Sequence, residues 1–265
     1  MSFNPLAKLR AETAERTYRL EGDALARYNF AKPYSKNKSV IDIGTGLGHG
    51  AGLLAQGTTQ NVTGIDAVSD AVREANRLYQ RPNLRFVCFD MLEGAHPAQE
   101  LGSFDVAIAF EIIEHLKLES GPIFLEKIKT IMAAQGALLL STPNKLITSP
   151  NTEKPGNPYH LKEYTPEEFG ALLRRHFSDV KLFGIKLENE KYLKKREQMT
   201  HTLQRKFFGW LSTHRIVHEL FFFVPKAIKS RVTGDAQLPQ LSESDFKIHS
   251  DSIETCDIML GVCRK

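Results

Sequence analysis

VIDIGTGLGHG, residues 40–50, is the stretch that decides how this chain begins to fold. It opens with a short apolar run around Asp42 that is typical of a buried strand, and AGLLA directly after it is typical of a helix. Glycines at positions 44, 46 and 48 lie between them, where the backbone must bend sharply and can approach a ligand. The stretch therefore predicts a strand, a glycine-rich turn and a helix.

Short β-rich runs alternate with helical segments beyond this stretch. Alternation of this length is typical of a parallel sheet that is covered by helices on both faces. We therefore expect an α/β, Rossmann-like, mostly parallel sheet of seven strands. The strands are expected at residues 39–43, 61–66, 84–89, 104–110, 136–141, 179–185 and 255–263.

The regular alternation breaks before the last expected strand. The interval at 187–250 is too long for a plain loop in a compact domain, so we expect it to contain helices of its own. The predicted organisation is a helical N-terminal segment at 1–38, a sheet-bearing domain at 39–186 and 251–265, and a basic, aromatic, helical insertion at 187–250.

Within the insertion, residues 191–232 are net positive, whereas the remainder of the chain is net negative. Residues 191–232 contain ten Lys or Arg and two Glu, a net +8, whereas the whole chain is +4, so the remainder is −4. Bulky apolar residues, among them Trp210 and residues 221–223, lie in the same segment. Three interpretations stay open: a packed helical cap, a lobe that recognises an anionic acceptor, and an interfacial helix at an anionic membrane surface. A basic patch also fits nucleic acid.

The overall composition is that of a globular protein, with 42% hydrophobic and 25% charged residues. The three cysteines are widely spaced and form no C-x-x-C pair, so neither a disulfide framework nor a zinc site is indicated. The charged N-terminus does not resemble a signal peptide, and no apolar run approaches the roughly 20 residues of a membrane span. We expect a cytoplasmic protein, with peripheral membrane attachment as an option through residues 191–232.

Three aspartates are expected at the carboxyl ends of neighbouring strands: Asp42, Asp66 and Asp90. Asp66 comes 22 residues after Gly44, where an acid can accept two hydrogen bonds from a ribose diol. Asp90 follows the third strand, where it can meet an adenine edge. Because open α/β sheets bind ligands at this edge, the three acids predict a nucleoside site, against the simpler interpretation of surface acids that end strands.

FEIIEHL, residues 110–116, places Glu111, Glu114 and His115 after the fourth expected strand. In a helical turn these three side chains would share one face. Further on, NPYHLKEYTPEEF adds His160 shortly before a helix that should begin at Thr165, the N-cap, with proline next.

Three accounts of this polar cluster stay open. In the first, the side chains only satisfy local hydrogen bonds. In the second, His115 or His160 is a general base that takes a proton from a hydroxyl, because an imidazole pKa of about 6.5 suits that role near neutral pH. In the third, the carboxylates and imidazoles hold a divalent ion, Mg, Mn or Zn, that polarises a hydroxyl.

VIDIGTGLGHG, Asp66, Asp90, FDVAIAFEIIEHL and GALLLSTPN together resemble the class I S-adenosylmethionine-dependent methyltransferases, over about residues 20–186 and the final strand. The resemblance implies an antiparallel last strand and a lid helix at ARYNFA, residues 26–31. It places Asp42 and the glycines around the methionine part of the cofactor, Asp66 at the ribose and Asp90 at the adenine. The implied cofactor-binding residues are Asp42, Gly44, Gly46, Gly48, Asp66, Asp90, Met91, Phe110 and Tyr28, with Arg27 as a further candidate.

The E-x-x-E-H turn also resembles that of small-RNA 3′-terminal 2′-O-methyltransferases and of ubiquinone-pathway O-methyltransferases. In the former the acids and histidines hold a metal, which implies Glu111, Glu114, His115 and His160 as catalytic residues and metal ligands here. The D/N-P-P-Y/F motif typical of exocyclic-amine methyltransferases does not follow the fourth strand, which favours an oxygen acceptor.

We therefore expect methyl transfer from S-adenosylmethionine to a hydroxyl of a small molecule, a glycan or a lipid-linked acceptor. An RNA 2′-hydroxyl is the first alternative. A nicotinamide-dependent oxidoreductase is disfavoured, because His49 stands where the fingerprint from Gly44 requires glycine and no Tyr-x-x-x-Lys pair lies near the fifth strand, although a fingerprint from Gly46 stays open. A non-catalytic cofactor-binding module is the remaining alternative.

Overall fold

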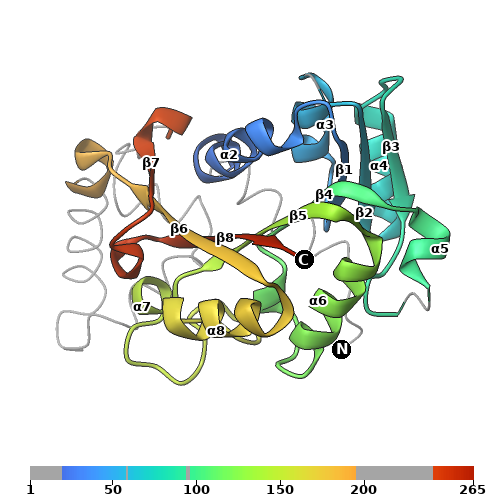
Figure 1. The fold of residues 1–265 in the computed structure, drawn as a ribbon. Coiled ribbons are helices and arrows are strands. Elements are labelled where there is room, and N and C mark those ends of the chain that lie inside the picture. Colours follow the sequence, from blue (N-terminus) through green and yellow to red (C-terminus); the bar gives the residue numbers. More distant parts are fainter. Residues whose placement is uncertain (1–19, 58, 94–95, 195–240) are drawn as a thin grey trace, which may run out of the picture.

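The computed structural model describes residues 20–57, 59–93, 96–194 and 241–265, and these form one sheet with helices packed on it (Figure 1). The strand order is β3-β2-β1-β4-β5-β8-β6-β7. The strands are β1 (Ser39–Ile43), β2 (Asn61–Asp66), β3 (Leu84–Cys88), β4 (Phe104–Phe110), β5 (Met132–Pro143), β6 (Asp179–Leu187), β7 (Phe246–His249) and β8 (Ile258–Arg264).

The sheet is parallel from β3 to β5, and β8 lies antiparallel between β5 and β6. The predicted α/β fold and its antiparallel last strand are therefore confirmed. The sheet has one strand more than expected, because β7 pairs antiparallel with the end of β6 at the edge of the sheet. This four-residue strand lies inside the interval that was predicted to be helical.

Helices cover both faces of the sheet, as expected (Figure 1). The central strand β4 is buried at every position except Asp105, which is half-buried, so it needs apolar cover on both sides. One core cluster includes residues of α6 and α8, and the other includes residues of α2, α3 and α4. The helices are η1 (Leu20–Ala24), α2 (Leu25–Ser35), α3 (His49–Ala55), α4 (Ser69–Leu78), α5 (Pro97–Leu101), η2 (Ile113–His115), α6 (Ser120–Ile131), α7 (Lys145–Thr148), α8 (Pro166–His176), η3 (Glu243–Asp245) and η4 (Ile253–Thr255).

Helix α8 begins where the sequence predicts it. Thr165 is the N-cap, and its hydroxyl oxygen accepts a hydrogen bond from the Glu168 backbone N–H. The Glu168 carboxylate in turn accepts one from the Thr165 backbone N–H, and Pro166 occupies the first helical position. This capping box fixes the chain direction directly after the segment that carries His160.

The two outer predicted segments are described only in part. Helix α2 includes the residues predicted as a lid helix, whereas residues 1–19 lie outside the described part of the chain. Of the basic, aromatic segment 191–232, only 191–194 are described, and they are helical. The domain boundaries therefore stay a prediction. Among the described residues, no helix has the length and hydropathy of a membrane span.

Asn144, at the end of GALLLSTPN, connects the end of β5, α7 and the turn before β8 by hydrogen bonds. Its side chain is fully buried, and its Nδ2 donates to the backbone carbonyls of Ile253, Glu254 and Cys256, at 3.2, 3.2 and 2.9 Å. Its Oδ1 accepts from the Leu146 backbone N–H and so caps α7. One amide therefore ties the turn before β8 to the end of β5 and starts α7.

Replacing Asn144 by alanine should destabilise the fold. The variant would remove the Asn144 donor from the buried Cys256 carbonyl and would remove a helix cap, so we expect the free energy of unfolding to fall by about 3 kcal/mol. Chemical denaturation measures this value. Gln99→Ala, at an exposed position of α5, is the control and should change it by less than about 0.5 kcal/mol. A loss below about 1 kcal/mol for Asn144→Ala would contradict this role.

Candidate functional site

The glycine-rich turn lies at the carboxyl edge of the sheet, between β1 and α3. Gly44, Gly46 and Gly48 have φ angles of +70°, +56° and +80°, which residues with a side chain rarely adopt. A Cβ on Gly48 would lie 2.6 Å from the Phe86 ring, whereas a Cβ on Gly46 would meet no atom within 4 Å. The turn is therefore packed against the domain at Gly48 and faces open space at Gly46. Open space beside the backbone is what a ligand-binding turn requires.

Asp66, the last residue of β2, holds this turn to the next loop. One carboxylate oxygen accepts a hydrogen bond from the Gly46 backbone N–H and the other from the Val68 backbone N–H, both at 2.9 Å. Each carboxylate oxygen can accept a second hydrogen bond. Asp66 therefore positions two loops and keeps the capacity to accept from a ligand.

Asp42 lies fully buried beneath the turn. Its carboxylate accepts hydrogen bonds from the Tyr28 and Thr45 hydroxyls, at 2.9 and 2.7 Å. Burial raises the pKa of Asp42 to about 6, although the bonds from Thr45 and Tyr28 act in the opposite direction. The Tyr28 ring packs edge-on against Phe110, with 5.2 Å between centroids. Tyr28 of α2 thus supports the buried acid under the turn.

Asp90 and Met91 follow β3 at the same edge. The Asp90 carboxylate accepts hydrogen bonds from the Leu92 and Glu93 backbone N–H groups, at 2.7 and 3.3 Å. Met91 is buried in the core. The acid therefore shapes the loop after β3, and its predicted contact with adenine stays a prediction.

Glu111 does not share a helical face with Glu114 and His115, so this part of the prediction is wrong. Its φ is +57°, and only residues 113–115 form the short helix η2. The left-handed residue redirects the chain between β4 and η2, so the Glu111 carboxylate accepts from the Ser141 hydroxyl at 2.8 Å. It also lies 3.8 Å from the Arg27 guanidinium.

Arg27 of α2 is a buried cation at this place, with 6% of its surface exposed. Burial alone would lower the pKa of Arg27, but the Glu111 and Asp23 carboxylates raise it above its ordinary value, so the guanidinium stays charged. Its Nε is buried and has no hydrogen-bond partner among the described residues. A buried charge with spare donor capacity is suited to an anionic ligand group.

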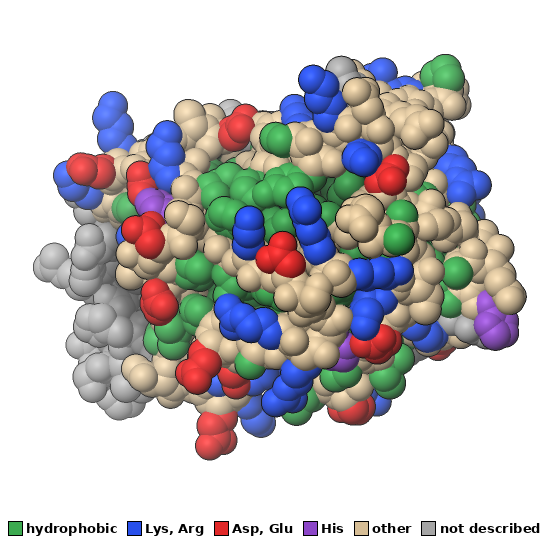
Figure 2. Space-filling view, viewed as in Figure 1, with side chains coloured by type: hydrophobic (Ala, Val, Ile, Leu, Met, Phe, Trp, Pro, Cys, Tyr) green, Lys and Arg blue, Asp and Glu red, His purple; other side chains and the backbone are tan. Residues whose placement is uncertain are grey.

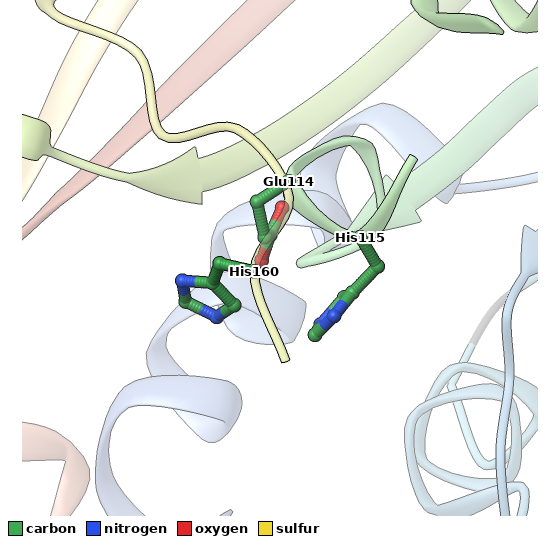
Figure 3. Close-up of side chains that lie close together, drawn as sticks. All are labelled: Glu114, His115 and His160. Carbon is green, nitrogen blue, oxygen red and sulfur yellow. The ribbon is translucent and has the colours of Figure 1, made fainter. Parts of the chain in front are cut away.

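Glu114, His115 and His160 lie close together (Figure 3). Each offers one ligand atom, and these atoms are within 4.8 Å of one another. The backbone carbonyl of Glu114 accepts from the Leu161 and Lys162 backbone N–H groups, which brings the second histidine to η2. The two imidazole rings meet edge to face at 5.0 Å. The structure thus gathers three of the four predicted residues, while Glu111 faces Arg27.

The hydrogen bonds of the two histidines assign their protons. His115 Nδ1 lies 3.0 Å from the Tyr159 carbonyl, which only accepts, so Nδ1 carries the proton. Asn157 Oδ1 accepts from the Tyr159 backbone N–H, so its Nδ2 donates to His160 Nε2 at 3.0 Å. His160 therefore carries its proton on Nδ1, which donates to Glu163 Oε1 at 2.6 Å. In its neutral form, an imidazole with its proton on Nδ1 has its lone pair on Nε2, and for His160 this is the nitrogen that accepts from Asn157.

Glu163 is the site residue that sequence reasoning missed. It is 2% exposed and accepts hydrogen bonds from His160, Thr148 and Ser149. Burial acts to raise the pKa of Glu163, but these hydrogen bonds outweigh it and lower the pKa, so the carboxylate is ionised. The signal available in the sequence was the three-residue spacing from His160 in HLKE.

Comparison with known proteins identifies the family. Residues 12–200, well over half of the chain, match the family described as "Methyltransferase domain", and the chain belongs to this family. A protein of Mycobacterium tuberculosis (strain ATCC 25618 / H37Rv), named a probable S-adenosylmethionine-dependent methyltransferase, is 30% identical over 159 residues. The match covers 60% of this chain and 55% of that protein, so it spans about half the length of the relative.

Solved structures share the fold at low sequence identity. A S-adenosylmethionine-dependent methyltransferase from Archaeoglobus fulgidus superposes with a TM-score of 0.58 at 17% identity, over 96% of this chain and 98% of that one. The plantazolicin methyltransferase BpumL, solved with S-adenosylhomocysteine, gives a TM-score of 0.56 at 16% identity, over 100% and 91%. The resemblance to the S-adenosylmethionine-dependent methyltransferases is therefore confirmed, whereas the narrower likeness of the E-x-x-E-H turn stays a prediction.

The raised pKa of Asp42 makes stability depend on pH. Between about pH 4 and pH 6 the folded protein holds a proton on Asp42 that the unfolded chain releases, so the free energy of unfolding falls as pH rises. Relative to Asp42→Asn, the wild type should lose about 2 kcal/mol across this window, because a full pKa unit corresponds to about 1.4 kcal/mol and both ends of the window are only partly titrated. Denaturation of both proteins from pH 4 to 7 measures the difference. A difference that does not change with pH would contradict the assignment.

Proposed function

We propose that this protein transfers a methyl group from S-adenosylmethionine to a hydroxyl of a small-molecule, glycan or lipid-linked acceptor, and that His160 accepts the hydroxyl proton. The observation that supports this best is the hydrogen-bond chain from Asn157 through His160 to Glu163, which leaves a lone pair on Nε2 of a neutral imidazole. This imidazole lies beside the end of β4, in a chain of the methyltransferase domain family.

The residues at the carboxyl edge fit the chemical groups of the cofactor. The open backbone at Gly46 suits close approach of the ligand, and Asp66 can accept from the ribose hydroxyls. The buried Arg27 guanidinium can donate its Nε–H to the methionine carboxylate. Asp90 and Met91 would line the adenine. When bound, the cofactor supplies an electrophilic methyl group on a sulfonium.

The chain's own part in the reaction is alignment and proton removal. An acceptor hydroxyl that replaces the Asn157 amide donates to the same Nε2 lone pair of His160. The imidazole then takes the proton, and the ionised Glu163 carboxylate stabilises the positive charge that forms. Holding the nucleophile in line with the methyl group supplies the rest of the rate.

A divalent ion in the same cluster is the second candidate mechanism. Glu114, His115 and His160 fit such an ion, since their ligand atoms converge and Glu163 orients one imidazole, as carboxylates do behind metal-bound histidines. The ion would lower the pKa of an acceptor hydroxyl. Glu111, the fourth expected ligand, is not part of this cluster.

The RNA alternative depends on the basic segment 191–232, which lies outside the described residues except for 191–194. On the face of the molecule in Figure 2, Lys and Arg side chains are interspersed with Asp and Glu. This face by itself therefore gives no support to the binding of a polyanion such as RNA. A small or conjugated hydroxyl acceptor therefore remains the proposal.

Removing the Asp66 carboxylate should weaken cofactor binding. Hydrogen bonds between a charged group and the ribose contribute about 1.5–3 kcal/mol, so Asp66→Ala should lower the affinity for S-adenosylhomocysteine by about tenfold or more. Isothermal titration calorimetry measures this affinity, and NAD titrated in parallel should not bind. Asp70→Ala, at a nearby acid that pairs with Arg73, is the matched control and should bind normally. Equal affinity of Asp66→Ala and the wild type would contradict the ribose contact.

Replacing His160 by alanine should slow methyl transfer and leave cofactor binding unchanged. Loss of a general base typically costs about 10²–10⁴ in turnover. Transfer of a labelled methyl group to a panel of hydroxyl compounds, with a short RNA included, measures the effect. His176→Ala is the control, because this histidine pairs with Glu126 on α6.

Two results of this assay separate the alternatives. Full activity after exhaustive chelation supports His160 as a general base without a metal. A loss of activity that Mg, Mn or Zn restores supports the metal-ion mechanism. Unchanged turnover in His160→Ala, or transfer only to amines, would contradict the proposal.

A further inference from the structure

We infer that Glu163 is a positioning residue: it holds the His160 imidazole in the tautomer that has its lone pair on Nε2. The inference rests on the proposed function, since it gives His160 the orientation and protonation that a base at the acceptor side requires. Neither the family match nor the relatives assign any role to Glu163.

The contact between the two side chains is short and shielded from water. Glu163 Oε1 lies 2.6 Å from His160 Nδ1, and the exposed fractions of the two side chains are 1% and 10%. A buried carboxylate is costly unless it is paired and hydrogen-bonded. Among the described residues, the basic side chain that meets Glu163 is this histidine rather than a Lys or Arg, and the neutral ring donates its Nδ1 proton to the carboxylate.

The carboxylate is itself fixed from the opposite side. Thr148, the last residue of α7, donates its hydroxyl hydrogen to Glu163 Oε2 at 2.8 Å, and the Ser149 side chain adds a further hydrogen bond. The start of α7 is in turn fixed by Asn144, the amide that ties β5 to the turn before β8. A continuous series of contacts therefore runs from the sheet to His160.

The other ring nitrogen faces the place where the acceptor would bind. Nε2 accepts from the exposed amide of Asn157, and the ring lies edge to face with His115 and near the buried Glu114. An acceptor hydroxyl has to donate to Nε2 in place of that amide. It can do so only while the ring proton is on Nδ1, and the Glu163 carboxylate, which has no proton to donate, enforces this.

Glu163→Gln separates the tautomer from the size of the side chain. The glutamine amide can donate to Nδ1, which moves the ring proton to Nε2 and removes the lone pair from the acceptor side. Long-range ¹⁵N–¹H correlation spectra of the full chain distinguish a protonated ring nitrogen from one with a lone pair, and His160→Ala identifies the His160 signals. We expect a proton on Nδ1 in the wild type and on Nε2 in Glu163→Gln. Turnover should fall at least tenfold in this variant, with the affinity for S-adenosylhomocysteine unchanged.

Glu168→Gln is the matched control. This acid lies five residues further on and pairs with Lys162, so its replacement should leave the His160 proton on Nδ1. A wild-type spectrum with the proton on Nε2 would overturn the inference even if Glu163→Gln does not fold. A folded Glu163→Gln variant that keeps the proton on Nδ1 would also overturn it. Because the spectra need neither cofactor nor acceptor, failure of the proposed methyl transfer is seen separately in the His160→Ala assay.

Discussion

The parallel direction of β1 to β4 is the constraint on which the site depends, because it brings the loops after these strands to one edge of the sheet. The Asp66 carboxylate links two of these loops through the Gly46 and Val68 backbone N–H groups. The positive φ angles of the glycines set the path of that backbone, which faces open space at Gly46. The proposed nucleoside site is therefore built from main chain and one acid.

The proposed acceptor side is built differently, from buried side chains that hold one another. Asn144 anchors α7 to the sheet, Thr148 of α7 binds Glu163, and Glu163 binds His160. The Glu114 carbonyl holds the same loop from the other side through two backbone N–H groups. Polar groups in a low-dielectric interior are rigid when all are paired, so this series can fix an imidazole on an otherwise exposed loop.

The fold could be predicted from the sequence because apolar periodicity and the glycine turn report directly on strands, helices and their order. Sequence reasoning missed the strand β7, although FKIH alternates apolar and polar residues, because four residues are too short a run to outweigh the expectation of helices in this interval. The orientation of Glu111 could not be predicted, because a glutamate with a positive φ gives no signal in the sequence. The His160–Glu163 hydrogen bond lies in a loop that the Glu114 carbonyl holds against η2. Such tertiary contacts cannot be read from the spacing of residues in the sequence.

Hydrogen–deuterium exchange of the wild-type chain, with and without S-adenosylhomocysteine, tests most directly whether the cofactor lies at the carboxyl edge of β1 to β3. We expect slower exchange on binding at the backbone amides of residues 44–48 and 66–68 and in the loop after β3, where the sheet places the glycine turn and the two aspartates. Binding that slows exchange only elsewhere in the chain, and leaves these three loops unchanged, would contradict this location.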